Sequence, residues 1–220
     1  MGTQLLLFSD RISHPARACL LLLQRSNLPF EEKKLDLFKG DHLKTKELPL
    51  KKIPVLIDNG FVLAESTTIL RYIALKSGDQ SVYPVDIRAR MKIDECLDFW
   101  QSSLNANVLR LVQNKLMWKL MLRRKEPDHK LIQEINKLHT MNKKAFNSYF
   151  LAGKPFVGGD NVSIADLLVA VTLEQSTIAG VDNSAEQGFI SRVKQEFKEY
   201  DSVHEDLGKI VGRLEQMKML

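Results

Sequence analysis

Cysteine is scarce in this sequence, which contains only Cys19 and Cys96 among its 220 residues. Two cysteines are too few for a disulfide framework in a chain of this length, and both lie in apolar helical patterns, so we expect buried thiols in a reducing compartment. Long apolar runs are missing too. Leu20 to Leu23 is too short to span a bilayer, and the first residues lack the basic region and long apolar core of a signal peptide. These absences predict a cytoplasmic protein that does not bind membranes.

A concentrated charge of one sign is also absent. The net charge is +5 and the isoelectric point lies near 9.1. Residues 1–80 hold 12 basic and 9 acidic side chains, and the remainder holds 20 and 18, so the excess of base is spread over the chain. Nucleic-acid-binding proteins usually carry a basic stripe, so no nucleic-acid partner is expected. His129, His139 and His204 have no acidic or cysteine partners at metal-ligand spacing, so no metal site is expected either.

The order of predicted elements divides the chain into two domains. Strand and helix patterns alternate in residues 1–80, residues 87–220 read as helices with short interruptions, and residues 81–86 form a linker. The elements expected in the first domain are the strand Leu5–Phe8, the helix His14–Gln24, the strand Phe30–Leu37, the short helix Asp41–Glu47, the strands Pro54–Ile57 and Phe61–Leu63, and the helix Thr67–Lys76. A βαβ unit followed by an antiparallel strand pair and a helix is typical of an α/β thioredoxin-like domain.

The second domain is expected to be all helical. Apolar residues at helical spacing predict helices over residues 87–112, 131–151, 164–175, 187–199 and 204–217. Ser163 with Asp166 three residues later is typical of a capping box at the start of the third of these helices. That helix is apolar on almost every side, so it should lie at the centre of the domain. The last two helices are more polar and are expected at its periphery.

The segment from Leu48 to Ser66 combines a hairpin with a helix start. Pro54 opens a short apolar strand, where a residue without an N–H group is tolerated and a cis bond is common, and Asp58 to Gly60 form the turn. Ser66 can cap the next helix, and the N-terminus of a helix attracts an anion. The same arrangement occurs in many α/β domains without any ligand. Spacing alone therefore leaves both a binding site and an ordinary hairpin open.

A second candidate site lies between the first strand and the first helix, where Ser13 precedes His14 and Pro15. The exposed N–H groups of a helix terminus favour the ionised form of a bound thiol. A serine hydroxyl can add one hydrogen bond to the thiolate, which stabilises the charged form further. The alternative is that Ser13 only caps the first helix. The residues alone do not decide between these two roles.

These motifs together resemble the cytosolic glutathione S-transferases, and the serine-type theta class most closely. The matching segments are Ser13–Ala18, Lys39–Leu43, Leu50–Pro54 and Glu65–Ser66, and the resemblance is strong to about residue 85 and looser beyond. It implies a thioredoxin-like domain followed by an all-helical domain. It also implies a homodimer that conjugates the thiolate of reduced glutathione to small hydrophobic electrophiles, with peroxidase activity as a further expectation. Glutathione would be a co-substrate, and no cofactor is expected.

The resemblance also implies roles for individual residues. Ser13 stands at the activating position. His42 and Lys52 would meet the glycyl carboxylate of glutathione, and the backbone of Ile53, before a cis Pro54, would pair with its cysteinyl unit.

Other residues would hold the opposite end of glutathione and the electrophile. Glu65 would face the γ-glutamyl ammonium and Ser66 the adjacent carboxylate, while Asp94 is a candidate for reaching the site of the partner subunit. The electrophile pocket is expected near the end of the long helix, at Leu109, Val112, Gln113, Leu116, Met117 and Leu120.

Two departures from the theta pattern, and several rival interpretations, accompany this hypothesis. Leu48 replaces a common asparagine, and the chain ends at Leu220, short of the C-terminal extension of vertebrate theta enzymes, which suggests a more open pocket. One rival is a non-catalytic transferase-like binding or assembly domain, which has no need of an activating serine. Another is the glutathione-dependent isomerisation of the zeta class, whose serine-serine-cysteine run is absent here. The stretch Lys115 to Lys125 could also bind calmodulin or a membrane, although buried apolar residues with flanking bases explain it more economically.

Overall fold

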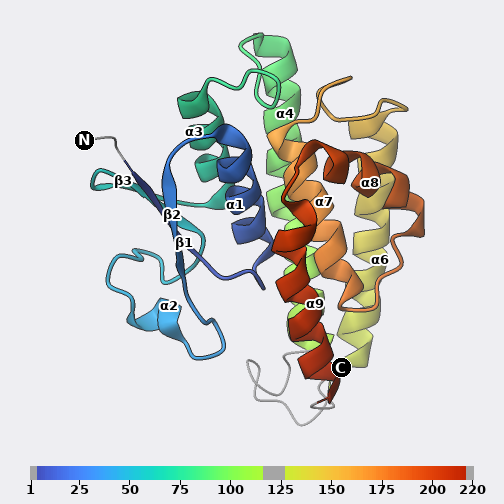
Figure 1. The fold of residues 1–220 in the computed structure, drawn as a ribbon. Helices are drawn as coiled ribbons and strands as arrows, with labels where there is room; N and C mark the ends of the chain where they lie inside the picture. Colours follow the sequence, from blue (N-terminus) through green and yellow to red (C-terminus); the bar gives the residue numbers. More distant parts are fainter. Residues whose placement is uncertain (1–3, 116–126, 217–220) are drawn as a thin grey trace.

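The computed structural model describes residues 4–115 and 127–216, and it consists of a small sheet domain beside a larger helical domain (Figure 1). The sheet has the order β2-β1-β3-β4, with β2 parallel to β1 and with β3 antiparallel to both β1 and β4. Its strands are β1 (Leu5–Ser9), β2 (Phe30–Lys34), β3 (Val55–Asp58) and β4 (Phe61–Ala64), and its helices are α1 (His14–Ser26), α2 (Asp41–Lys44) and α3 (Ser66–Ser77). The thioredoxin-like arrangement predicted from the sequence is confirmed.

Most predicted boundaries in this domain differ from the observed ones by one to three residues. The two largest differences, at the ends of β2 and α2, are explained by side-chain hydrogen bonds. β2 ends at Lys34 rather than Leu37, since the Asp36 carboxylate accepts a bond from the Lys39 N–H and folds the chain into turns. α2 ends at Lys44 rather than Glu47, where the Thr45 hydroxyl donates to the carbonyl of Asp41 in place of a further helical turn. A smaller difference, at the start of α3, belongs to the candidate site below.

The helical domain is built around α7 (Ile164–Thr177), as its all-round apolar pattern predicted. The residues from Ile164 to Leu173 are all buried, and Glu174 is half-buried. The other helices are α4 (Ile87–Phe99), α5 (Ala106–Lys115), α6 (His129–Ala145), α8 (Gln187–Glu196) and α9 (Tyr200–Gln216), with π-helical turns at Trp100–Asn105 and Phe146–Leu151 and a short 3-10 helix at Ser184–Glu186. α4 continues through its π-turn into α5 as the predicted long helix. None of the helices in the described ranges is both long enough and apolar enough to cross a membrane.

α1 joins the two domains because it packs on both. Its residues Ala18 to Leu23 are all buried, and the helix contacts α3 on one side and α7 on the other (Figure 1). Each fully buried leucine contributes roughly 1.5–3 kcal/mol relative to an exposed one. The predicted burial of Cys19 and of Cys96 on α4 is also confirmed. The position of α1 therefore depends on the helical domain as much as on the sheet.

The last helix is less peripheral than its polar sequence predicts. α9 begins at Tyr200, four residues before the expected His204, and Tyr200 and Val203 are buried in the main core. The Tyr200 hydroxyl donates to Glu174 of α7 over 2.7 Å. The first turns of α9 are thus anchored inside the domain, which corrects the sequence-based expectation.

The connection at residues 81–86 is packed rather than loose. Val82 is fully buried and Tyr83 is 6% exposed. The Val82 carbonyl accepts a hydrogen bond from the N–H of Ile164 at the start of α7, and the Tyr83 hydroxyl donates to the Asp94 carboxylate on α4. This segment holds the two domains together through contacts along its own length.

Candidate active site

The strand register brings four segments to one end of the sheet. Phe8 of β1 lies opposite Val55 of β3, and Val55 lies opposite Ala64 of β4. On the other side, Ser9 pairs with Lys34 at the end of β2. Since neighbouring strands lie about 4.8 Å apart, the segments that enter or leave the sheet here start close together. They carry the residues predicted to bind glutathione: Ser13, His42, Lys52, Ile53, Pro54, Glu65 and Ser66.

Ser13 occupies the N-cap position of α1, but its side chain makes no capping hydrogen bond in the described structure. Its backbone is held instead, because its N–H donates to the Asp10 carbonyl and its carbonyl accepts from the Arg17 N–H. The side chain is half-buried. The hydroxyl therefore stands beside a helix N-terminus, and its hydrogen has no acceptor among residues 4–115 and 127–216. This geometry disfavours the interpretation in which capping is the role of the hydroxyl.

His14, which directly follows Ser13, is buried and neutral. Its Nε2 lies 2.8 Å from Oδ1 of Asn105, in the π-turn of the helical domain. Burial lowers the pKa of His14 to about 3, and the nearby Arg17 charge acts in the same direction. No role was expected for His14 from the sequence. The position of His14 next to Ser13 was the one sequence signal that pointed to it. Its hydrogen-bond partner, Asn105, lies in a distant part of the sequence.

Arg17 is a fully buried cation behind the Ser13 segment. Its Nη1 donates to the carbonyl of Arg11 over 2.7 Å, while its Nη2 donates to Oε1 of Gln175 on α7 over 2.8 Å. Burial lowers the pKa of Arg17 to about 10, partly opposed by the negative charge of Glu174, so the guanidinium stays protonated at neutral pH. Arg17 belongs to the family-like motif, but its link to α7 could not be read from local spacing.

The approach to β3 has the predicted proline geometry. The Ile53–Pro54 bond is cis, and no hydrogen bond joins the backbone of Ile53 to any residue within 4–115 or 127–216. Lys52 is exposed. Leu48 is fully buried in a small cluster with Phe8 and Val55. Leu48 therefore contributes an apolar contact to the cluster on which Ile53 packs, while the neighbouring Lys52 is exposed.

The start of α3 differs from the prediction in one respect. Ser66 is the first helical residue and Glu65 is the N-cap, without a side-chain capping bond. Glu65 has φ 70° and ψ 115°, an unfavourable backbone region for a residue other than glycine, at a cost of about 1–3 kcal/mol. Such conformations gather at ligand-binding sites. Glu65 is exposed and Ser66 is 8% exposed, so the pair presents a carboxylate beside a second helix N-terminus.

His42 shows an unmet hydrogen-bonding group. It lies on α2, half-buried, and its buried Nδ1 has no hydrogen-bond partner among the described residues. Buried polar atoms without partners are uncommon in folded proteins. His42 is therefore suited to bind a ligand with hydrogen-bonding groups, as the sequence analysis expected.

The predicted electrophile pocket is only partly described. Leu109 is 43% exposed, Gln113 is half-buried, and Val112 packs on a cluster around Leu111. The remaining members, Leu116, Met117 and Leu120, lie outside the described residues, as does most of the stretch Lys115 to Lys125. This part of the site stays a prediction.

The carboxylate of Asp94 is already engaged within its own chain. Its Oδ1 lies 2.6 Å from Nε of Arg71, and both oxygens accept bonds from the Tyr83 hydroxyl. A further contact to a partner subunit stays a prediction for this residue. Among the residues that the structure describes, no three His, Cys, Asp or Glu side chains are grouped to hold a metal ion.

Known proteins are similar to this chain in sequence and in fold. Residues 3–75 match the family described as glutathione S-transferase, N-terminal domain. Glutathione S-transferase theta-1 of mouse is 33% identical over 178 residues, covering 79% of this chain and 73% of that protein. The chicken theta-1 protein is 34% identical over 205 residues, covering 83% and 77%.

Solved structures give the same result. The apo form of human glutathione-S-transferase T1-1 has a TM-score of 0.84 at 29% identity, over 91% of this chain and 88% of that one. A human theta-class enzyme bound to the glutathione conjugate of 1-menaphthyl sulfate has a TM-score of 0.88 over 100% and 92%; at 24% identity it supports the fold alone. By sequence identity, coverage and fold, the chain belongs to the glutathione S-transferase family and is similar to its theta class.

Proposed function

We propose that this protein conjugates the thiolate of reduced glutathione to small hydrophobic electrophiles, as a theta-like glutathione S-transferase. The observation that carries this proposal is the Ser13 hydroxyl. It has no capping bond in the described structure, and it stands beside the α1 N-terminus at the sheet end that also presents Pro54 and Glu65. A thiol bound there would meet one hydroxyl donor and one helix terminus.

The proposed chemistry begins with ionisation of the thiol. The proton leaves to solvent, and the Ser13 hydroxyl donates a hydrogen bond to the sulfur anion. Lowering the thiol pKa by one unit requires about 1.4 kcal/mol of preferential thiolate stabilisation. A hydrogen bond to a charged group contributes about 1.5–3 kcal/mol and a helix terminus about 0.3–1 kcal/mol, so together they could ionise much of the thiol at neutral pH. The sulfur then attacks an electrophilic carbon, and the leaving group departs with the bonding electrons.

The remaining predicted residues would orient glutathione. We assign His42 and Lys52 to the glycyl carboxylate, supported by the unpartnered ring nitrogen of His42 and the exposed ammonium of Lys52. The free backbone of Ile53 would pair with the cysteinyl unit. Glu65 and Ser66 would hold the ammonium and carboxylate of the γ-glutamyl end, where the α3 N-terminus also favours an anion.

We also propose a homodimer in the cytoplasm. Support for the dimer comes from exposed apolar side chains on α4, where Ile87 is 70% exposed and Met91 49%, beside a shallow hollow lined by these residues with Arg88, Lys92 and Glu95. A second copy of the chain is the partner that the family resemblance implies. The two free cysteines support a reducing compartment.

Turnover of a panel of electrophiles tests the proposal. Alkyl halides, epoxides, isothiocyanates and organic hydroperoxides would identify the substrate class, and the hydroperoxides would test the further proposal of peroxidase activity. In parallel, the ultraviolet absorbance of the bound thiolate is titrated in the native protein, in Ser13→Ala and in the exposed control Ser148→Ala. We expect the thiol pKa to rise by one unit or more in Ser13→Ala alone. An unchanged pKa would remove the role of Ser13.

The rival function, a non-catalytic binding or assembly domain, makes the opposite prediction. Such a protein would bind glutathione without shifting its thiol pKa, and no member of the panel would be turned over. Retention on immobilised glutathione would not separate the two functions, because enzymes of the theta class, which this chain resembles, often bind that matrix poorly.

A further inference from the structure

Hydrogen bonds to Asp10 hold the segment from Asp10 to Ser13 in a tight turn. The Asp10 Oδ1 accepts a hydrogen bond from the N–H of Ile12, and the Asp10 carbonyl accepts one from the N–H of Ser13. The Asp10 Oδ2 accepts a third from the N–H of Leu37, beyond β2. The turn that presents the Ser13 hydroxyl is therefore compact, and its orientation depends on its contacts with other elements of the chain.

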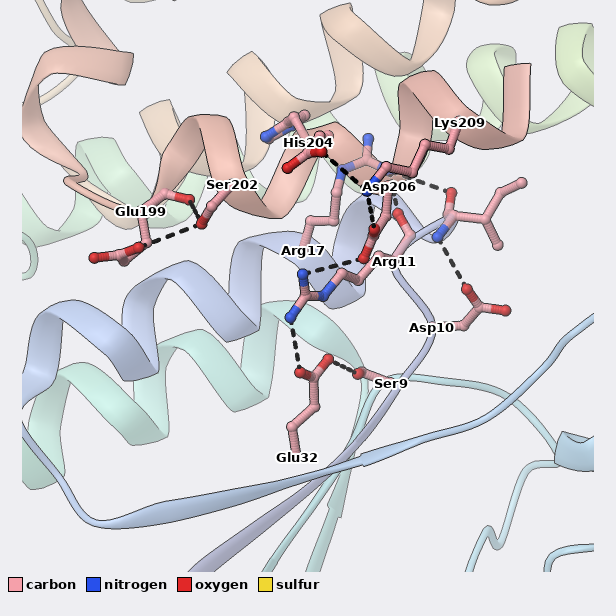
Figure 2. Close-up of polar contacts among 12 residues, drawn as sticks. Ser9, Asp10, Arg11, Arg17, Glu32, Glu199, Ser202, His204, Asp206 and Lys209 are labelled. Carbon is pink, nitrogen blue, oxygen red and sulfur yellow. Dashed lines mark hydrogen bonds and ion pairs between the residues drawn. The ribbon is translucent and has the colours of Figure 1, made fainter. Parts of the chain in front are cut away.

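Arg11, in the same turn, forms two ion pairs in opposite directions (Figure 2). Its Nη2 lies 3.2 Å from Oε2 of Glu32 on β2, and its Nη1 lies 3.1 Å from Oδ2 of Asp206 on α9. Glu32 is itself fixed, because its Oε1 accepts a 2.6 Å bond from the Ser9 hydroxyl. Arg11 thus bridges the sheet and the last helix of the chain.

The three side chains are partly shielded from water. The exposed fractions are 21% for Arg11, 12% for Glu32 and 38% for Asp206. Partial burial strengthens an ion pair relative to one on the open surface. The backbone carbonyl of Arg11 is held at the same time by the buried guanidinium of Arg17. Arg11 is therefore held at its main chain by a hydrogen bond and at its side chain by two ion pairs.

α9 has separate anchors to the helical domain and to the Ser13 turn. Tyr200 and His204 both lie against Glu174 of α7, and Asp201 pairs with Lys194 of α8. Among the α9 side chains that the structure describes, Asp206 is the one that forms an ion pair with the sheet domain. A change in the position of α9 would therefore be transmitted to the Ser13 turn through this pair.

We propose that Arg11 is a positioning residue, which through its ion pair with Asp206 couples helix α9 to the turn that presents Ser13 and so keeps the hydroxyl aimed at the thiolate. This inference rests on the proposed glutathione chemistry. It assigns functions to two residues, Arg11 and Asp206, that the sequence analysis did not single out. Catalytic groups lose efficiency steeply when displaced, so a modest loss of orientation would be measurable.

The test compares two Asp→Asn variants in the same helix. Asp206→Asn removes the pair with Arg11, whereas Asp201→Asn removes an exposed pair with Lys194 that does not touch the Ser13 turn. We expect Asp206→Asn and Arg11→Met each to lower kcat/KM for glutathione about fivefold and to raise the thiol pKa of bound glutathione by a few tenths of a unit. The double variant should lose no more than Arg11→Met alone, since that substitution already removes the pair with Asp206 along with the pair with Glu32. Asp201→Asn should match the native protein.

The inference fails if Asp206→Asn behaves like Asp201→Asn, or if the losses in the double variant multiply. Amide hydrogen exchange of the glutathione-free protein separates this failure from that of the proposed function. Exchange at Ile12 and Ser13 should be faster in Asp206→Asn than in Asp201→Asn. If the native protein neither ionises glutathione nor turns over an electrophile, the proposed function is wrong, while the exchange rates still decide whether α9 holds the turn.

Discussion

The N-termini of α1 and α7 use the same residue type in opposite ways. Ser163 caps α7 with a complete capping box: it accepts a hydrogen bond from the Asp166 N–H, and its own N–H donates to the Asp166 carboxylate. Ser13 occupies the same position on α1 and forms no such side-chain bond in the described structure. Ser163 is fully buried, whereas Ser13 is half-buried beyond the end of the central strand β1.

This difference separates residues that stabilise the fold from residues that are available to a ligand. The polar groups at the start of α7 are satisfied within the protein, so changes there should reduce stability and leave the chemistry of the folded molecules intact. The polar groups at Ser13, His42 and Lys52 have few partners of their own. Changes among them should reduce activity and leave stability nearly intact.

The largest expected effect is the loss of stability in Asp166→Ala. The Asp166 carboxylate accepts hydrogen bonds from the N–H groups of Val157 and Ser163 and from the Ser163 hydroxyl, all in a fully buried site. Leaving buried donors without a partner costs about 1–3 kcal/mol for each group, so the free energy of unfolding should fall by about 4 kcal/mol. Chemical denaturation measures this loss. A variant with native stability would show that the capping box does not stabilise the domain.

The next comparison is between two Ser→Ala variants. Removing the Ser163 hydroxyl breaks two hydrogen bonds and should lower the free energy of unfolding by about 1.5 kcal/mol. Ser13→Ala breaks no capping bond, so its free energy of unfolding should change by less than about 0.5 kcal/mol. Denaturation curves of the two variants, measured together, test the contrast. Equal losses would mean that Ser13 is a structural cap after all.

Acid should destabilise the start of α1 through His14. The pKa of His14 is lowered from its ordinary value of 6.5 to about 3 in the folded protein, because burial disfavours the charged ring. The unfolded chain binds more protons between these values, so stability is lost as the pH falls below about 6.5. Between pH 7.5 and 5.5 the loss from this residue is about 1.4 kcal/mol.

His14→Gln should remove that share of the pH dependence. Denaturation of the native and variant proteins at both pH values gives the change in the free energy of unfolding with pH for each protein. The two changes are then compared. The buried His139, whose pKa is lowered to about 4, is present in both proteins and cancels. Parallel pH profiles would contradict the assignment to His14.

The smallest expected effect is on glutathione affinity in Lys52→Gln. A solvent-exposed ion pair contributes about 0.7 kcal/mol, so KM for glutathione should rise about threefold while kcat stays constant. The exposed Lys46→Gln serves as the matched control. Since salt screens exposed charges, the difference between the variants should shrink at high ionic strength. A fall in kcat instead would place Lys52 in the chemical step.

The strands of the first domain and the capping box of α7 could be predicted because local patterns determine them. The short apolar strand after Pro54, the turn at Asp58 to Gly60 and the pair Ser163 and Asp166 each depend on neighbouring residues. Such patterns extend over only a few neighbouring positions, so a single sequence is sufficient to predict them. The residues proposed to contact glutathione came from the family resemblance, and the strand register places their segments at one end of the sheet.

The contacts behind Ser13 could not be predicted, because they join distant parts of the chain. His14 meets Asn105, Arg17 meets Gln175, and Arg11 meets Asp206, with no shared pattern to link the members of each pair. Local spacing also mispredicted the cap of α3, since nothing near Glu65 signals its positive φ. Tertiary contacts and backbone conformation decide these features.

The buried connection through Val82 and Tyr83 affects whether the two domains can be separated by proteolysis or truncation. A protease that requires an extended, accessible strand would find Val82 and Tyr83 buried in this connection until the molecule opens. A gene fragment ending near residue 80 would leave the apolar face of α1 that now contacts α7 without its cover, and the product should aggregate. The chain is therefore expected to unfold in one cooperative transition, as a single unit that cannot be separated into modules.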